Sequence, residues 1–421
     1  MDMDMVDYLI LGAGISGLSA SYHLKQKGYE SIIIEKESQI GGLCRSFKIN
    51  GFTFDHFIHL SFTQNDYVKS IFNSQVDSIE HIPNPHCYYQ GKWIKHPAQN
   101  NLFPLEVEEK IKVFIDFVNR KQIKEQTYAD WLFNCYGESF AKSFPMRYTR
   151  KYWGVEASEL ELEWIGKRMY KPSMEEVLRG MLTEDTPVTY YAKKMYYPIK
   201  GGYLSYIKPL AVGSHIQLNE RVLSIDLENK TVLTTKHCYP YRHLISSLPL
   251  PALVELTKDA PQYLKDAANQ LRYTSGYIIS VGLKTKNIPP YLWMYVYDED
   301  LLPARIYSPS LKSSNNAPED CASIQAEVYV DSRKLLKESD ETILKKTVND
   351  LIRMKVINQE DILFTDIRFE SFANVTFTHD VYQNRGIIRS FYEDRGIKLI
   401  GRFGRWEYFW SDQSLLSGKN L

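Results

Sequence analysis

The chain has 421 residues and carries 51 Lys and Arg against 51 Asp and Glu, so its formal net charge is zero and no basic excess points to nucleic acid. Hydrophobic residues make up 44% and charged residues 24%, as in an ordinary globular protein, and this length predicts two or more domains. Five dispersed cysteines show no metal-ligand spacing, and no apolar run reaches the roughly 20 residues of a membrane span. We therefore expect a cytoplasmic protein with no metal site.

The N-terminal segment has the pattern of a dinucleotide-binding unit. The apolar run Tyr8–Leu11 leads into Gly12-x-Gly14-x-x-Gly17, apolar residues then follow at helical spacing, and a second apolar stretch ends in Glu35. In such a unit the three glycines allow, in turn, a tight turn, the approach of a pyrophosphate, and close packing of helix on strand. The acid after the second strand accepts the ribose hydroxyls and disfavours a 2′-phosphate.

Two further glycines, Gly41 and Gly42, follow the acid closely. This E-x-(4–6)-G-G pattern resembles the flavoproteins typified by amine oxidases, protoporphyrinogen oxidases and UDP-galactopyranose mutases, where the paired glycines pass beside the flavin diphosphate. The resemblance implies FAD rather than NAD. It also implies a set of cofactor-binding residues, namely Gly12, Gly14, Gly17, Glu35, Gly41 and Gly42.

The next segment, Phe47–Phe62, alternates around Asn50-Gly51 and predicts a β-hairpin whose end reaches the cofactor. It resembles the flavoprotein segment G-F-x-F-D-x-G-G-H that passes the flavin ring, and it aligns His59 with the histidine of that motif. Phe57-Ile58 replaces the usual Gly-Gly. Since bulky residues do not share the conformational freedom of glycine, we expect them not to adopt the glycine conformation here.

Further along the chain, Gln90-Gly91 predicts a second hairpin, and residues 104–180 have a helical composition with helices expected over 106–118 and 128–136. Strand-like pieces follow, interrupted by the polar stretch Lys312–Asp320, which we expect to be a flexible loop. Together with Tyr190–Tyr197, this stretch is a candidate for a mobile loop that closes the site.

These elements predict an α/β fold with a discontinuous Rossmann-type FAD-binding domain, a helical insertion domain and an antiparallel-sheet substrate domain. We assign residues 1–75, 200–247 and 385–421 to the FAD-binding domain and residues 102–195 to the helical domain. Residues 76–101 and 248–384 form the β-sheet substrate domain in this division.

The C-terminal run G-R-F-G-R-W-E-Y, which begins at Gly401 and is followed by Asp412-Gln413, is similar to UDP-galactopyranose mutases, especially the eukaryotic type. Four further matches follow the order of that family: Gly91-Lys92-Trp93 with Pro97-x-Gln99, Tyr148-Thr149-x-Lys151-x-Trp153-Gly154, Trp164-x-Gly166-x-Arg168, and Trp293-x-Tyr295 with Arg305. The resemblance spans nearly the whole chain.

The resemblance implies a function and a set of site residues. The function is an FAD-dependent interconversion of the pyranose and furanose forms of a UDP-hexose in cell-surface polysaccharide synthesis, with the N5 atom of reduced FAD as nucleophile and NAD(P)H as reductant. Arginines suit the departing diphosphate because they form bidentate, charge-assisted hydrogen bonds. The implied residues are Arg168, Arg305, His59 and Tyr408 for catalysis, Gly401, Arg402 and Gln413 for the cofactor, and Phe62, Gln99, Trp153, Tyr295 and Asp412 for the substrate.

The sequence also departs from that family. His96 and Ala373-Asn374 stand where tyrosines are expected, and Asp412 stands where the family has asparagine. A carboxylate near a diphosphate is repulsive unless a sugar hydroxyl or a cation compensates it. The sequence therefore leaves the identity of the sugar undetermined. Two alternatives stay open as well: a flavin oxidoreductase of the amine oxidase or protoporphyrinogen oxidase type, and a flavin-binding scaffold without turnover. The sequence leaves a homo-oligomer possible.

Overall fold

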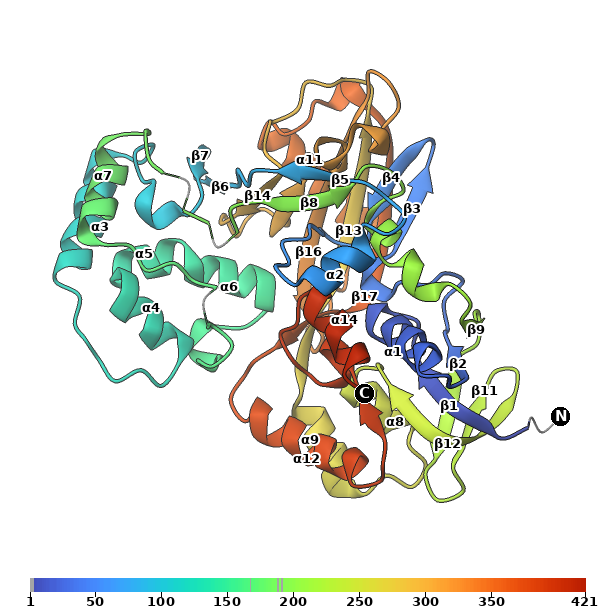
Figure 1. The fold of residues 1–421 in the computed structure, drawn as a ribbon. Coiled ribbons are helices and arrows are strands. Elements are labelled where there is room, and N and C mark those ends of the chain that lie inside the picture. The colour runs from blue at the N-terminus through green and yellow to red at the C-terminus, as the bar shows by residue number, and fades with distance from the viewer. Residues whose placement is uncertain (1–3, 167, 188, 191) are drawn as a thin grey trace.

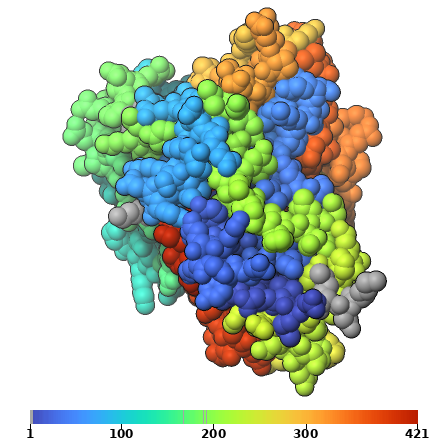
Figure 2. Space-filling view, turned by 45° about the vertical axis from the view of Figure 1, so that its right-hand side comes forward, coloured from blue at the N-terminus to red at the C-terminus, as the bar shows by residue number. Residues whose placement is uncertain are grey.

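The structure is a computed structural model that describes residues 4–166, 168–187, 189–190 and 192–421. Figure 1 shows three parts: a mixed sheet around the N-terminal unit, a long second sheet, and a group of helices that projects to one side. Figure 2 shows the C-terminal segment, in red, between the blue N-terminal unit and the cyan and green helical part. The predicted α/β fold class is confirmed.

The first sheet has the strand order β10-β11-β12-β1-β2-β9, and β18 also pairs with β12. β1 lies parallel to both β2 and β12, so segments far apart in sequence meet at its centre, as in a discontinuous Rossmann-type domain. Its strands are β1 (Val6–Leu11), β2 (Ser31–Ile34), β9 (His215–Gln217), β10 (Val222–Asp226), β11 (Thr231–Thr234), β12 (Cys238–Ser246) and β18 (Lys398–Leu399).

Helices surround this sheet. Gly418 lies against α1 so closely that an added Cβ would come within 2.2 Å of the Ser16 carbonyl oxygen, so the first and last helices pack backbone to backbone. The helices are α1 (Ile15–Gln26), α2 (Asp66–Phe72), α8 (Leu250–Leu256), α9 (Gln262–Gln270), α12 (Val381–Glu393), α13 (Gly401–Gly404) and α14 (Ser411–Lys419).

The second sheet has the order β17-β13-β16-β15-β14-β6-β7 and is antiparallel except where β14 meets β6. The predicted hairpin at Gln90-Gly91 joins β6 to β7, with both residues at positive φ. α11 (Asp340–Arg353) packs its apolar side on this sheet. The strands are β6 (His86–Tyr89), β7 (Lys92–Lys95), β13 (Arg272–Leu283), β14 (Trp293–Val296), β15 (Arg305–Tyr307), β16 (Ala322–Asp331) and β17 (Ile362–Thr376).

The helical part confirms both helices expected from the sequence. Thr127 and Asp130 form a capping box that starts α4, and Gly154 ends α6 in the left-handed conformation. An added Cβ on Gly154 would lie 2.8 Å from Asp331, so α6 meets the second sheet at this point. The helices are α3 (Val107–Val118), α4 (Tyr128–Tyr136), α5 (Glu138–Ser143), α6 (Pro145–Trp153) and α7 (Met174–Leu182).

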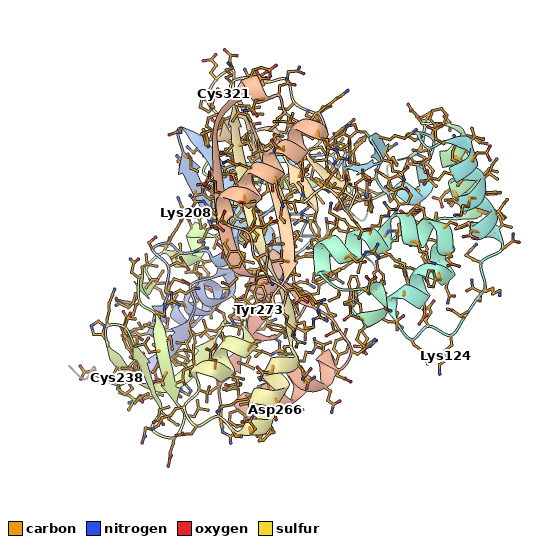
Figure 3. The ribbon with its side chains drawn as sticks, turned by 180° about the vertical axis from the view of Figure 1, so that it is seen from behind. Lys124, Lys208, Cys238, Asp266, Tyr273 and Cys321 are labelled. Carbon is orange, nitrogen blue, oxygen red and sulfur yellow. The ribbon has the colours of Figure 1, made fainter. Side chains whose placement is uncertain are left out.

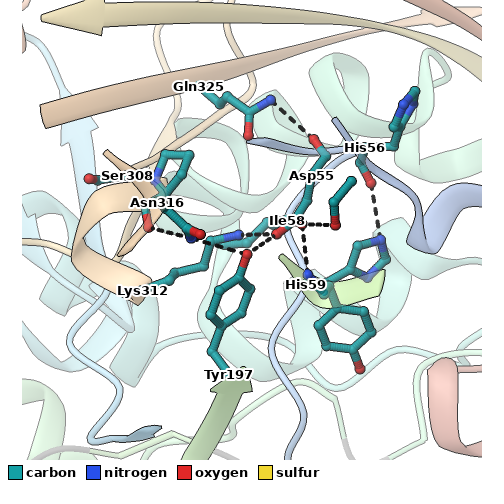
Figure 4. Close-up of polar contacts among 12 residues, drawn as sticks. Asp55, His56, Ile58, His59, Tyr197, Ser308, Lys312, Asn316 and Gln325 are labelled. Atoms are coloured by element: carbon teal, nitrogen blue, oxygen red, sulfur yellow. Dashed lines mark hydrogen bonds and ion pairs between the residues drawn. The ribbon is translucent and has the colours of Figure 1, made fainter. Parts of the chain in front are cut away.

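A buried ion pair joins the predicted Asn50-Gly51 hairpin to the second sheet. The hairpin forms as β3 (Ser46–Ile49) and β4 (Phe52–Asp55). Asp55 at its end accepts a 2.8 Å hydrogen bond from the Lys312 ammonium, and both side chains are fully buried (Figure 4). The Asp55 carboxylate also accepts from the Tyr197 hydroxyl at 2.7 Å. Lys312 ends the short helix α10 (Pro309–Lys312).

The expectation that Lys312–Asp320 is a flexible loop is therefore wrong in its first half. Lys312, Ser313 and Asn316 are buried, and a 3₁₀ turn forms at Ser314–Asn316. The polar residues that suggested a loop form hydrogen bonds in the interior: the Lys312 ammonium donates to the buried Asp55 carboxylate, and the Asn316 side chain donates to the Pro309 carbonyl. These partners compensate the burial of the polar groups. In the other loop candidate, residues 195–198 form β8 (Met195–Pro198), paired with β5 (Ser78–His81), while residue 191 lies outside the described residues.

Candidate active site

One cavity of about 1830 Å³ is bounded by the glycine turn, the helical part, the second sheet and the C-terminal segment. Ligand sites for one small molecule commonly measure about 300–1,000 Å³. The cavity is therefore large enough for a dinucleotide and a second ligand side by side.

The glycine turn forms a cradle at one end of this cavity. Gly14 and Gly41 form an isolated parallel β-bridge, and the Gly41 amide donates to the Ala13 carbonyl at 2.8 Å. A Cβ added to Gly14 would meet only Gly42 Cα, at 3.9 Å, so the backbone at the start of α1 is open to the cavity. Gly17 has a packing role instead, because an added Cβ would lie 1.9 Å from the Gly12 carbonyl oxygen. These positions fit the diphosphate of a dinucleotide.

The carboxylate of Glu35 lies at the edge of the same cradle. The Ala13 amide donates to Glu35 Oε2 at 2.7 Å, and the Glu37 amide donates to Oε1 at 3.0 Å. Glu35 is buried, directly follows β2 and lines the cavity. Two backbone amides thus fix an acceptor group where a ribose is expected, so the residues present fit FAD.

Phe57 corrects the expectation about the replaced glycine pair. Its φ is +64°, so this bulky residue adopts the left-handed conformation that glycine favours. The next amide, of Ile58, donates to Glu327 Oε1 at 2.7 Å, and the Phe57 ring stacks on Tyr329 with centroids 5.7 Å apart. Tertiary contacts therefore hold a conformation that sequence propensity opposes, as is common near functional sites.

A pair of substitutions at this position measures the backbone strain. Phe57→Gly and Phe57→Ala both remove the ring, so their difference isolates the positive φ. We expect the glycine variant to be the more stable by about 1 kcal/mol, the reverse of the usual order for these residues. Urea unfolding of both variants checks this, and an alanine variant of equal or greater stability would contradict the strained conformation.

His59 lies beside the cavity with its ring held in place. Its Nε2–H donates to the His56 carbonyl oxygen at 3.0 Å (Figure 4). It also donates to the Leu43 carbonyl oxygen at 2.8 Å, and the ring stacks on Tyr203. Burial lowers the pKa of His59 to about 4. The imidazole is therefore neutral at pH 7 and offers no positive charge to an anionic ligand.

Arg305 reaches the cavity from the second sheet. Its Nε donates to Glu327 Oε2 at 2.6 Å and its Nη2 donates to the Tyr329 hydroxyl at 2.9 Å. Burial works against the charged form, but the Glu327 carboxylate outweighs it and holds the pKa of Arg305 well above its ordinary value. Glu327 thus anchors both this guanidinium and the Ile58 amide. Sequence reasoning missed Glu327, although an acid inside the apolar strand β16 is an available signal.

Arg168 reaches the cavity from the other side, after α6. Its Nη2 donates to the Tyr408 carbonyl at 3.0 Å and its Nη1 donates to the Trp164 carbonyl at 2.9 Å. The guanidinium lies over the Tyr408 ring at 4.4 Å and the Trp410 ring at 4.9 Å. Such stacking fixes a planar cation in one orientation. Trp410 is a further residue that sequence reasoning missed, although it belongs to the C-terminal run that carried the resemblance.

The cavity also brings together the aromatic and amide residues expected for the substrate. Phe62 meets Trp410 edge to face at 4.7 Å, and Tyr295 lies 4.9 Å from His96. The side chain of Gln99 donates to the Tyr170 carbonyl at 3.1 Å. The predicted residues that line the cavity are Gly12, Gly14, Glu35, Gly41, Gly42, His59, Phe62, Gln99, Trp153, Arg168, Tyr295, Arg305, Gly401, Arg402 and Tyr408.

Asp412 and Gln413 are not among the residues that line the cavity. The Gln413 side chain accepts from the Trp410 amide at 2.9 Å and caps α14, and Asp412 lies in the first turn of that helix. Asn374, which stands where a tyrosine was expected, lines the cavity and accepts from the Tyr152 hydroxyl at 3.1 Å. The local chemistry at these positions therefore differs from the predicted pattern.

The residues that the structure describes include neither a metal-ligand cluster nor a helix that could span a membrane. No cluster of three or more His, Cys, Asp or Glu side chains among them has the arrangement of a metal site. None of their helices combines the length and apolarity that crossing a bilayer requires.

Proteins of known structure with a similar fold align with nearly the whole chain. A reduced UDP-galactopyranose mutase has a similar fold, with a TM-score of 0.90 and 23% identity, over 99% of this chain and 94% of that one. A structure described as a putative protoporphyrinogen oxidase from Exiguobacterium sp. 255-15 has a TM-score of 0.75 and 17% identity, over 100% of this chain and 98% of that one. At these identities, the likeness shows the fold.

Curated relatives match over shorter stretches. A probable UDP-galactopyranose mutase of Klebsiella pneumoniae is 24% identical over 169 residues, which are 38% of this chain and 44% of that protein. An inactive all-trans-retinol 13,14-reductase of Danio rerio is 40% identical over 52 residues, or 12% of this chain and only 9% of the relative. The family described as flavin-containing amine oxidoreductase matches residues 15–401. With the glycine cradle and Glu35 in place for FAD, the chain belongs to the flavin-containing amine oxidoreductase family.

Proposed function

We propose that this protein is an FAD-dependent nucleotide-sugar mutase that interconverts the pyranose and furanose forms of a UDP-hexose in cell-surface polysaccharide synthesis. The observation that carries the proposal is the pair Arg168 and Arg305, which extend from different parts of the fold into the cavity that also holds the glycine cradle. A flavin oxidoreductase acting on a neutral amine has no need of two guanidinium groups there. A nucleotide diphosphate needs both groups, because negative charge develops on the diphosphate as its bond to the sugar breaks.

We assign the substrate roles from the resemblance to UDP-galactopyranose mutases, and the same arrangement supports them. Arg168 and Arg305 bind the diphosphate, and Tyr408 adds a hydrogen bond beside Arg168. Phe62 and Tyr295 belong to one apolar cluster and flank the uracil, Gln99 contacts its edge, and Trp153 borders the sugar. These assigned roles are supported by two observations: all of these residues line the same cavity, and the Trp153 ring contacts the Tyr408 ring with centroids 5.5 Å apart.

The cofactor roles divide between two ends of the chain. Gly14 and the Gly41-Gly42 pair hold the FAD diphosphate, Glu35 accepts the ribose hydroxyls, and Gly401 and Arg402 contact the flavin side. When bound and reduced by NAD(P)H, FAD supplies a nucleophilic nitrogen toward the anomeric carbon. The protein's own contribution is to hold the sugar nucleotide with its diphosphate between two fixed cations. His59, which is neutral at pH 7, borders the cavity without adding to their positive charge.

Anaerobic turnover tests this function. The purified protein is reduced with dithionite, given UDP-galactopyranose or UDP-galactofuranose, and followed by chromatography. Interconversion that requires reduction is the expected result. A yellow, reducible protein that converts no sugar nucleotide from a broad panel would contradict the mutase function and leave FAD binding intact.

A flavin oxidoreductase is the second candidate. It is favoured by the family match over residues 15–401 and by the fold shared with the putative protoporphyrinogen oxidase. Reduction of bound FAD by an amine or a porphyrinogen, with peroxide formed under air, would decide for it. If neither substrate class reduces the flavin, this candidate is excluded.

A further inference from the structure

Tyr152, near the end of α6, lines the cavity and has no role in the proposed function. Its ring contacts the Trp153 ring with centroids 4.9 Å apart, and the Arg305 guanidinium lies 5.6 Å from the centre of the Tyr152 ring. Burial raises the pKa of Tyr152 and the nearby Tyr408 raises it further, whereas the charges of Arg305 and Arg402 lower it. The phenol is therefore neutral at pH 7, and it lies among residues assigned to the substrate and to the cofactor.

The hydroxyl of Tyr152 donates its proton to the second sheet. The acceptor is Asn374 Oδ1, at 3.1 Å, and the Asn374 side chain belongs to a residue that is only 4% exposed. The amide nitrogen of Asn374 donates in turn to Thr274 Oγ1 at 3.4 Å, across the strand pair β13 and β17. Figure 3 shows Tyr273, which precedes Thr274 on β13, near the middle of the molecule. Asn374 thus connects Tyr152 to the inner part of this sheet.

This arrangement leaves the Tyr152 oxygen as a hydrogen-bond acceptor. A phenol carries a single proton, and Asn374 takes it. The structure gives this hydroxyl no donor among the described residues. Because hydrogen bonds in a chain polarise one another, the donated proton also strengthens the oxygen as an acceptor. Phosphate oxygens bring no proton to such a group, whereas a sugar hydroxyl does.

We propose that Tyr152 accepts a hydrogen bond from one hydroxyl of the bound hexose, and that Asn374 is the positioning residue that orients the phenol for this contact. The inference rests on the proposed function, because it takes the ligand to be a sugar nucleotide. Arg168 and Arg305 are pure donors and suit the diphosphate, while Tyr152 recognises the sugar beside it. The pair Tyr152 and Asn374 then selects a hexose with a free hydroxyl at this place, since a sugar without it leaves the phenol oxygen unpaired.

Binding to the oxidised holoenzyme tests this contact without turnover. Isothermal titration calorimetry gives the dissociation constants of UDP and of UDP-galactopyranose for the wild type and for Tyr152→Phe. We expect the variant to raise the dissociation constant of UDP-galactopyranose about tenfold and to leave that of UDP unchanged, because only the first ligand carries the hexose. The matched control is Tyr263→Phe, an exposed position on α9, which is expected to change neither value. Circular dichroism and the bound-flavin spectrum verify that each variant is folded.

Fluorinated sugars identify the hydroxyl that Tyr152 contacts. Analogues of UDP-galactopyranose that each carry fluorine in place of one sugar hydroxyl lose one donor at a time. At least one analogue is expected to bind the wild type about tenfold more weakly than UDP-galactopyranose does. In Tyr152→Phe, the same analogue is expected to bind as well as UDP-galactopyranose, because the variant has no phenol oxygen left to accept from that hydroxyl.

Asn374→Leu tests the positioning role separately. It keeps the phenol but removes its acceptor, so we expect weaker binding of UDP-galactopyranose, by less than in Tyr152→Phe, with UDP binding unchanged. The double variant is expected to match Tyr152→Phe alone, because Asn374 acts through Tyr152. If Tyr152→Phe does not fold, the comparison of UDP with UDP-galactopyranose in Asn374→Leu decides the question.

Several outcomes would overturn the inference. One is a folded Tyr152→Phe variant that binds UDP-galactopyranose as the wild type does. Another is an equal loss of affinity for UDP and for UDP-galactopyranose, which would assign Tyr152 to the diphosphate. A third is a set of fluorinated analogues that lose the same affinity in the variant as in the wild type. A folded wild type that binds neither ligand would contradict the proposed function itself, whereas the expected binding pattern without turnover would contradict only the mutase reaction.

Discussion

Arg168→Ala is expected to lower mutase turnover by about 10²- to 10³-fold, the usual cost of removing one preorganised donor from a developing negative charge. The guanidinium is held by the Tyr408 and Trp164 carbonyls and by two aromatic rings, so it meets the diphosphate without reorganisation. Anaerobic chromatography of UDP-galactopyranose and UDP-galactofuranose gives kcat and KM for the variant and the wild type.

Three further variants sharpen this test. Arg168→Lys keeps the charge but loses the planar, bidentate geometry, so we expect activity between those of the wild type and the alanine variant. Arg305→Ala is expected to lose at least as much activity, but it also leaves the buried Glu327 without its cation, so its unfolding curve must accompany its kinetics. Arg353→Ala removes an exposed arginine and serves as the control. An Arg168→Ala enzyme that binds FAD and retains half of its kcat/KM would contradict the diphosphate role.

Lys312→Ala is expected to lower the free energy of unfolding by about 3–5 kcal/mol, because it leaves the fully buried Asp55 carboxylate without its cation. The lost side chain also connects the hairpin end to α10 and so to the second sheet. Urea unfolding, followed by circular dichroism on the flavin-free protein, measures the change without a contribution from cofactor release.

Lys286→Ala is the matched control, because it breaks an exposed pair with Asp320 and is expected to cost less than about 1 kcal/mol. A Lys312→Ala variant within 1 kcal/mol of the wild type would contradict the structural role of the buried pair.

The buried pair of Asp55 and Lys312 also predicts how stability depends on pH. Burial raises the pKa of Asp55, but the attraction of Lys312 and the hydrogen bonds from Tyr197 and Tyr203 outweigh it and hold this pKa below its ordinary value. Its stabilisation is therefore present at neutral pH and is lost as the pH falls below about 4.

The sequence by itself determined the features that depend on neighbours along the chain. The glycine turn between β1 and α1 and the hairpins at Asn50-Gly51 and Gln90-Gly91 were predictable, because strand periodicity and positive-φ turns are local properties. Arg168, Tyr408 and Arg305, which line the cavity, were predicted as site residues through short motifs that resemble a known family.

Only the tertiary structure decided what depends on partners distant in sequence. Lys312 looked like part of a polar loop because its partner Asp55 lies 257 residues away. Phe57 adopts a positive φ because Glu327 and Tyr329, on β16, hold it there. Trp410 joins the site because Arg168 stacks on it. A buried charge or a strained backbone is stable only when such a contact compensates it, and one-dimensional patterns carry no record of that contact.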